Sequence, residues 1–309
     1  MKKLILIFLA LAGCVQGSAV NLLKYVPADA ELIMHINTRQ VKASQCMKKF
    51  QKINPGSHLE LLKLPEKLLS IKSENSDIIN KAVIFLKIDH SVRGMLASGR
   101  LRKENTQCLT DTVKCKDKIK LFSKKNFAGH EVYIYRPEKN TSQNIAFTFV
   151  SPKITLCSPL EYMEDTLKSC LKAVNTSHQA IRDIDKNAAV WAAYYSFNSA
   201  SKAVNYPFDT VKKLYAKLNF TGKKYTDLSI EGRIFCKNNK GAADLATLLN
   251  GLVMLLLPEG FQSNPELAGK LAQRVKMQPA GSIIKVELSI PEKLLDALLN
   301  YYQKQAEKT

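Results

Sequence analysis

The side chains of this sequence that could support nucleophilic or metal chemistry are seven cysteines and five histidines. The histidines are scattered, and even His35 and His58, the nearest pair, are far apart in the chain. Neither the closely spaced cysteine pairs of structural zinc sites nor the paired histidines of a zinc protease helix occur. The serine elbow G-x-S-x-G and the glycine-rich phosphate loops are also missing. The sequence therefore predicts no metal, no cofactor and no catalytic residue, although a Cys–His pair assembled by the fold stays open.

Cys14 stands apart from the other cysteines because of the residues that precede it. Lys2 and Lys3 come before an apolar run, Leu4 to Leu11, as in a secretory signal that is too short for a permanent membrane span. Residues 11–14, Leu-Ala-Gly-Cys, resemble the bacterial lipoprotein box, in which an aliphatic and two small residues precede a lipid-modified cysteine. We therefore expect residues 1–13 to be a signal peptide and Cys14 to carry the lipid.

A second cleavage site competes with the first. Val15 and Gly17 put short or small residues at positions −3 and −1 of an ordinary signal peptidase site before Ser18. That cut would leave a soluble periplasmic or secreted protein. We favour the lipid anchor because all four positions of the box match. In the lipoproteins that the box resembles, an Asp after the cysteine often marks the inner membrane; Val15 occupies this position, so the outer membrane is preferred.

The chain is strongly basic, with a formal net charge of +19 that falls to +17 when Lys2 and Lys3 leave with the signal. Basic proteins attract polyanions, and an exported protein meets anionic lipid headgroups, phosphorylated glycans and acidic proteins rather than nucleic acid. The densest cluster is a candidate patch for such an anionic surface, formed by Lys114, Lys116, Lys118, Lys120, Lys124 and Lys125. Alternatively, these lysines only protect an edge strand against aggregation.

Six cysteines remain if Cys14 is lipidated, and an exported protein can pair them in three disulfides. They are Cys46, Cys108, Cys115, Cys157, Cys170 and Cys236. The alternative is that several are buried free thiols, since Cys packs as a small apolar residue. Cys157 and Cys236 lie in apolar, strand-like runs and suit that second role.

Hydrophobic periodicity predicts an α+β protein of two halves, residues 14–178 and 179–309. Each half is expected to hold a mainly antiparallel sheet with helices on one face. Strands are predicted over 31–37, 81–89, 95–101, 130–136, 144–150, 153–157, 188–197, 225–236 and 283–290. Helices are predicted over 41–53, 58–71, 158–173, 199–218, 241–258, 265–274 and from 291 onward. The apolar run at 241–258 is slightly short for a membrane span and is interpreted as a buried helix.

The two halves share a motif that suggests duplication. In each, a strand with Lys-x-x-Leu leads into a Ser, a Pro and a Glu three residues after the Ser, and then into an amphipathic helix. The pairs are Ser158 with Glu161 and Ser289 with Glu292, which read as helix caps. Capped helices after strands also look alike for physical reasons alone, so shared origin is one of two explanations.

Several segments resemble a group of bacterial exported proteins with no assigned activity. The shared features are a Pro27-Ala28-Asp29 turn before the first strand, and Gly129, Val132 and Tyr133 in a strand followed by an alternating strand pair and a helix. The resemblance implies export and an α+β fold. We expect a lipid-anchored envelope protein with a non-enzymatic binding or structural role. The alternatives are a carrier of an apolar ligand, in a cavity between sheet and helices, and thirdly a hydrolase.

Lipidation at Cys14 is directly testable. Intact-mass analysis of the mature protein, expressed in a bacterium with its own signal, is expected to show a chain that begins at an acylated Cys14. The variant Cys14→Ala should lose the acyl mass and leave the membrane fraction. A mature wild-type chain that begins at an unmodified Ser18 would refute the lipid anchor.

Overall fold

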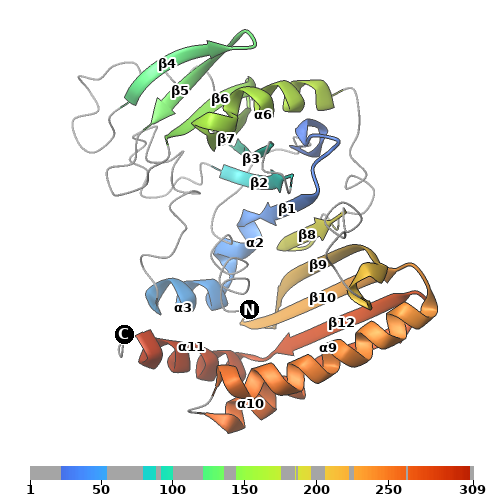
Figure 1. Cartoon of the computed structure of the whole chain (residues 1–309). Helices are drawn as coiled ribbons and strands as arrows, with labels where there is room; N and C mark the ends of the chain where they lie inside the picture. Colours follow the sequence, from blue (N-terminus) through green and yellow to red (C-terminus); the bar gives the residue numbers. More distant parts are fainter. Residues whose placement is uncertain are drawn as a thin grey trace. The chain divides into compact units, whose positions relative to one another are not determined.

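Two antiparallel sets of strands, drawn from different parts of the chain, form the framework of the protein (Figure 1). The computed structural model describes residues 22–53, 79–87, 92–99, 121–135, 144–174, 185, 187–195, 206–222, 226–261 and 264–306. The chain divides into unit 1, residues 1–42 and 56–187, and unit 2, residues 43–55 and 188–309. The boundary expected between residues 178 and 179, the expected helix at 58–71 and the lipid site at Cys14 lie outside the described residues.

The described part of unit 1 contains seven strands in the order β1-β2-β3-β7-β6-β5-β4, and every pairing among them is antiparallel. Their bounds are β1 Leu32–Asn37, β2 Ile79–Leu86, β3 Arg93–Gly99, β4 Leu121–Phe127, β5 His130–Tyr135, β6 Ile145–Ser151 and β7 Ile154–Pro159. The β4–β5 hairpin closes at Ala128 and Gly129, which both have positive φ, as a tight two-residue hairpin turn requires. The predicted strands of this half are confirmed, while β4 was not anticipated.

Helix α6, Leu160–Ala173, packs on β3, β6 and β7 through the buried side chains of Met163, Leu167 and Cys170. The helix has the predicted extent, but the predicted serine cap is wrong. Ser158 belongs to β7 and donates its hydroxyl to the Arg93 carbonyl at 2.7 Å, while Pro159 takes the N-cap position without any side-chain cap. The short helices η1, Leu22–Tyr25, and α2, Thr38–Ala43, complete the described part of unit 1.

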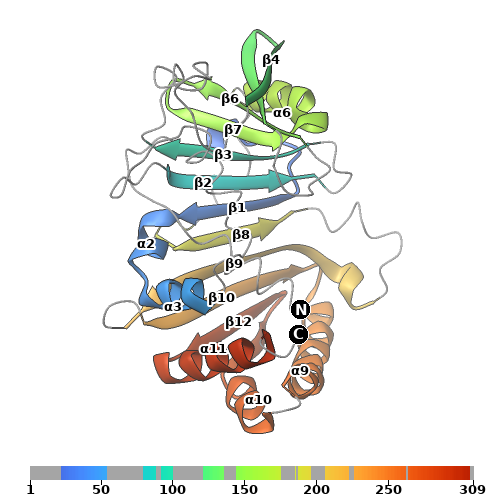
Figure 2. The ribbon, with the colours of Figure 1, turned by 90° about the vertical axis from the view of Figure 1, so that its left-hand side faces the viewer.

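Unit 2 contains five strands in the order β8-β9-β10-β12-β11, again with antiparallel pairing throughout. The strands are β8 Val190–Tyr194, β9 Val211–Thr221, β10 Asp227–Cys236, β11 Val275–Ala280 and β12 Ile283–Ile290. Figure 2 shows the helices on one face of this sheet. They are α3 Gln45–Ile53, α9 Asn239–Gly260, α10 Pro265–Ala272 and α11 Glu292–Ala306, and the 3₁₀ turn η4 is Phe208–Thr210.

The helical prediction for residues 199–218 is wrong where the structure describes them, because residues 211–221 form β9. The apolar positions Val211, Leu214, Tyr215 and Leu218 repeat with the period of a helix, whereas Leu214, Leu218 and Phe220 also fit a strand. The segment forms a strand because it pairs with β8 on one side and β10 on the other. Such tertiary contacts often override the local sequence pattern. Strand β11 was missed as well, since Pro279 lies within its short run.

The described cysteines Cys46, Cys157, Cys170 and Cys236 are buried free thiols. Burial raises the pKa of Cys46 and of Cys157 to about 12, so neither thiol is ionised at neutral pH. The alternative of buried packing thiols is therefore confirmed for these four. Cys108 and Cys115 lie outside the described residues.

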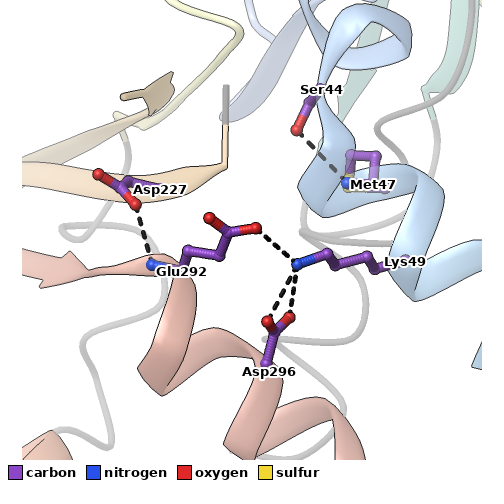
Figure 3. Close-up of polar contacts among 6 residues, drawn as sticks. All are labelled: Ser44, Met47, Lys49, Asp227, Glu292 and Asp296. Atoms are coloured by element: carbon purple, nitrogen blue, oxygen red, sulfur yellow. Dashed lines mark hydrogen bonds and ion pairs between the residues drawn. The ribbon is translucent and has the colours of Figure 1, made fainter. Parts of the chain in front are cut away.

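Helix α3 belongs to unit 2 because it packs against α11 near the other end of the sequence. In Figure 3 the Lys49 amine lies between two carboxylates of α11, 2.8 Å from Glu292 Oε1 and 2.7 Å from Asp296 Oδ1. The hydrogen bond that Lys49 donates to Asp296, and then the one it donates to Glu292, raise the pKa of Lys49 and keep it charged. Asp227 of β10 accepts the Glu292 backbone N–H at 2.9 Å, so a strand residue caps α11 rather than the predicted Ser289.

The Lys49 contacts are half exposed, so we expect a modest effect on stability. Replacing Lys49 with Met should lower the free energy of unfolding by about 1 kcal/mol, because it removes two ion pairs and leaves two carboxylates close together. Lys48→Met, at an exposed position of the same helix, is the matched control and should change it by less than about 0.5 kcal/mol. Urea unfolding measures the free energy of unfolding of both variants. Equal losses in Lys49→Met and Lys48→Met would show that the ion pairs contribute nothing.

His35 of β1 generates a prediction about pH. Its side chain is 5% exposed, and Nδ1 has no hydrogen-bond partner among the described residues. Burial, and to a lesser degree the charge of Lys81, lowers the pKa of His35 to about 4. The folded state therefore holds a neutral imidazole, whereas the unfolded chain binds a proton below about pH 6.5. Stability is lost as the pH falls from about 6.5 toward 4.

When the pH is lowered from 7 to 5, protonation of His35 in the unfolded chain should lower the free energy of unfolding by about 2 kcal/mol. His35→Leu is expected to remove that part of the pH dependence in urea unfolding. Lys81→Met should reduce it only slightly, since burial is the larger cause of the shift. If His35→Leu and the wild type lost stability in parallel over this range, His35 would not be the group responsible.

Candidate functional site: the exposed half of helix α9

Helix α9 begins as an ordinary core helix. Asn238 caps it by accepting the Gly241 N–H at 2.7 Å, and a Cβ at Gly241 would lie 2.7 Å from Thr210 Cγ2, so only glycine allows this approach to η4. Ala242, Leu245 and Ala246 are then buried in a cluster with Ile284 of β12 and Cys236 of β10. The first half of the helix is thus fixed on the apolar face of the unit 2 sheet.

The second half of α9 leaves that core while remaining apolar. Met254 is 64% exposed and Leu255 66%, and Leu248 and Leu256 are exposed by 37% and 38%. We call these four residues the α9 apolar patch. Leu248 and Leu255 are seven residues apart and so lie on one side of the helix, next to Met254. Clustered apolar side chains in water usually mark a surface that contacts a partner or a membrane.

The prediction of a buried helix at 241–258 therefore holds only for its first half. Within the described part of the chain, residues 239–258 are apolar and long enough to cross a membrane by length and composition, and only 22% of that stretch is buried. The signal was available in the sequence: the run from Leu252 to Leu257 is apolar on all sides of a helix. Such a run is either deeply buried or in contact with lipid.

A polar contact holds α9 on its sheet close to the residues whose side chains are exposed on the outer side of the helix. Asn250 donates its side-chain amide to the Met277 carbonyl of β11 at 3.1 Å, between the buried half and the apolar patch. The helix ends where the Phe261 N–H meets the carbonyls of Leu257 and Pro258. The patch therefore lies on a helix that the Asn250 contact holds on the sheet.

The lysine patch predicted from the sequence is described only in part. Lys124 and Lys125 lie on β4, the edge strand of the unit 1 sheet, while Lys114, Lys116, Lys118 and Lys120 lie outside the described residues. Lys124 contacts Glu131 Oε1 at 3.2 Å and lies 5.1 Å from the centre of the Tyr133 ring. An edge position agrees with the protective role, and binding of an anionic surface stays a prediction.

The described histidines and cysteines do not converge. His130 contacts the Phe149 carbonyl through Nδ1 at 3.0 Å, and His35 is buried in β1. Within the residues that the structure describes, no group of three His, Cys, Asp or Glu side chains is placed to hold a metal ion.

Comparison with known proteins yields a likeness of fold. No protein-family model matches this chain, and the search of curated proteins found no match. Crystal form III of TP0453 has a similar structure, with a TM-score of 0.50 and 9% identity over 92% of this chain and 100% of that chain. Crystal form I of TP0453 gives a TM-score of 0.48 and 10% identity over 92% of this chain and 98% of that one. The likeness extends over most of the chain, concerns the fold alone and assigns no family.

Proposed function

We propose that the protein is a non-enzymatic component of the bacterial envelope, held at a membrane by lipid on Cys14. We propose further that the α9 apolar patch rests in the same membrane surface. The observation that carries this proposal is the exposure of Met254 and Leu255, each more than three-fifths exposed on a helix that is otherwise built into a core. The matched lipoprotein box at residues 11–14 supports a location at the membrane.

The energy available from the patch is enough to orient an anchored protein. The apolar surface that its four side chains expose together equals that of about two fully exposed leucine side chains. Burying that surface is worth about 4 kcal/mol, at roughly 2 kcal/mol for each fully buried side chain. Several acyl chains on Cys14 would hold the protein at the membrane, but a flexible lipid anchor does not fix its orientation. The patch is suited to fix which side of unit 2 faces the lipid.

Interfacial contact fits α9 better than a membrane-spanning helix does. A span would have to withdraw Ala242, Leu245 and Ala246 from the core and break the Asn250 contact with β11. Contact by the outer side of residues 248–256 leaves those interactions in place. A helix lying in the interface buries one apolar side about 5–10 Å deep, which the patch can satisfy without unfolding.

We also infer that the two units are copies of one ancestral unit. In each, the first three strands form a meander, the last strand pairs with the third, and the penultimate strand lies beyond it. A helix follows the last strand in both, α6 in unit 1 and α11 in unit 2. The shared motif does not align residue for residue, however: Cys157 separates Leu156 from Ser158 in unit 1, whereas Ser289 follows Leu288 directly in unit 2.

Flotation with vesicles tests the membrane proposal. A chain lacking residues 1–17, and hence lacking any lipid, is expected to float with phospholipid vesicles through α9. Leu255→Asp should reduce the bound fraction at least tenfold, because a carboxylate cannot enter the apolar layer. Binding through the patch should persist in high salt, which screens charges but does not weaken apolar contacts.

Ala243→Asp is the matched control, since it adds the same charge to an exposed position of the same helix outside the patch. It should bind vesicles as the wild type does. Unchanged binding of Leu255→Asp, with folding confirmed by circular dichroism, would refute the role of the patch. Binding that disappears in high salt would instead assign membrane contact to lysines.

A further inference from the structure

The face of the unit 2 sheet that points away from the helices carries an ordered set of cations. Strand pairing places Tyr215, Arg233 and Lys285 side by side on β9, β10 and β12, while Ile234 and Ile284 face the helices. In the next row Lys213 pairs with Phe235. Arg233 and Lys285 are exposed, and Lys213, Tyr215 and Phe235 are partly exposed. We call these five residues the cationic face.

Aromatic rings hold the cations of this face in place. The Lys213 amine lies 4.8 Å from the centre of the Phe235 ring, and the Arg233 guanidinium lies 5.9 Å from that of Tyr215. The two rings are themselves 5.4 Å apart. A cation over an aromatic ring is stabilised by the ring's electron density and loses some of its freedom. The face therefore presents positioned charges rather than mobile ones.

The pairing of Arg233 with Lys285 is unfavourable by itself, and the acids of this face, Glu231 and Glu287, are paired with each other two residues further along the strands. Arg233 lies directly opposite Lys285, and like charges directly opposite on neighbouring strands destabilise a sheet. Neither residue makes an ion pair with a carboxylate among the described residues. Glu231, the nearest acid along β10, is engaged with Lys217 at 3.0 Å. Neighbouring strands are about 4.8 Å apart, so one phosphate can contact both side chains.

We propose that the cationic face binds a phosphate-bearing polysaccharide. Arginine matches the oxygens of a phosphate in bidentate fashion, and lysine adds a point charge. Because the rings lie beneath the cations, their role is to support the charges rather than to stack on sugars. Three cations on three neighbouring strands, Lys213, Arg233 and Lys285, suit a linear polyanion better than a small molecule, which needs a concave site.

The choice of a polysaccharide over a membrane rests on the proposed function. The helices cover one face of the unit 2 sheet (Figure 2), and strand alternation puts the side chains of the cationic face on the other. If the α9 apolar patch rests on a bilayer, the cationic face points away from that bilayer. It is then open to polymers in the surrounding envelope and not to the headgroups beneath α9.

Titration of the chain lacking residues 1–17 with a phosphomannan, and with uncharged mannan as the matched ligand, tests the proposal. Binding of phosphomannan alone is expected. The double variant Arg233→Gln with Lys285→Gln should weaken it at least tenfold and reduce the dependence of log Kd on log salt by about two, because two phosphate contacts are lost. The control, Lys48→Gln with Lys293→Gln, removes the same charge from exposed positions on α3 and α11 and should bind normally.

Three results would overturn the proposal: no binding of phosphomannan, equal weakening in the control, or loss of vesicle binding instead of phosphomannan binding in the double variant. Either of the first two results would show that the cationic face is not a binding site for the polysaccharide. The third would show that it binds a membrane instead. Leu255→Asp separates this proposal from the proposed function. It should abolish vesicle binding and leave phosphomannan binding unchanged, so each of the two can fail alone.

Discussion

The two-sided nature of an antiparallel sheet is the constraint on which the rest of unit 2 depends. Alternate residues of β9, β10 and β12 face opposite sides, and the apolar set must be covered. Helices α3, α9, α10 and α11 provide that cover. Helix α9 has 22 residues and is about 33 Å long, whereas β11, its main partner, has six residues and spans about 20 Å. The helix is therefore longer than β11, and Met254 and Leu255 in its second half are exposed, although Phe261 at its C-cap is buried against Tyr301 of α11.

That excess length is what turns a structural helix into a candidate contact surface. A soluble helix would have polar residues where the sheet ends, but the sequence continues with Leu252 to Leu257. The opposite side of the sheet obeys the same alternation and exposes Arg233 and Lys285. One constraint thus yields two surfaces of different chemistry on opposite sides of a single unit, one apolar and one cationic.

The sequence predicted those parts of the fold in which local pattern and tertiary context agree. Helix α6 and strands β10 and β12 have clear periods, and the structure contains them. Strand β9 was misread because Val211, Leu214, Tyr215 and Leu218 follow a helical period, while the strand period is carried only by Leu214, Leu218 and Phe220. No local signal could place α3 with the second unit, since Lys49 meets Glu292 and Asp296 across more than two hundred residues of sequence.

The candidate surfaces show a similar division. The apolar run of α9 was visible in the sequence, but its exposure depends on where the sheet ends. The cationic face was hidden because its members come from three strands, and β9 had been assigned to a helix. The densest run of lysines drew attention instead, although Lys124, the best described of them, is engaged with Glu131 on an edge strand. A high density of lysines in the sequence is a poor guide to a charged surface whose residues are brought together by strand pairing.

Magnitudes decide how these surfaces would divide the work. Each basic residue near an anionic surface contributes about 1 kcal/mol, and its influence decays within about 8 Å at physiological salt. The net charge of +19 on the chain therefore does little at a distance, and specificity must come from charges in direct contact. Acyl chains on Cys14 would set whether the protein stays at the membrane, and about 4 kcal/mol from the apolar patch would set its orientation. The cationic face, with only a few contacts of this size, can select a partner but cannot hold the protein in place by itself.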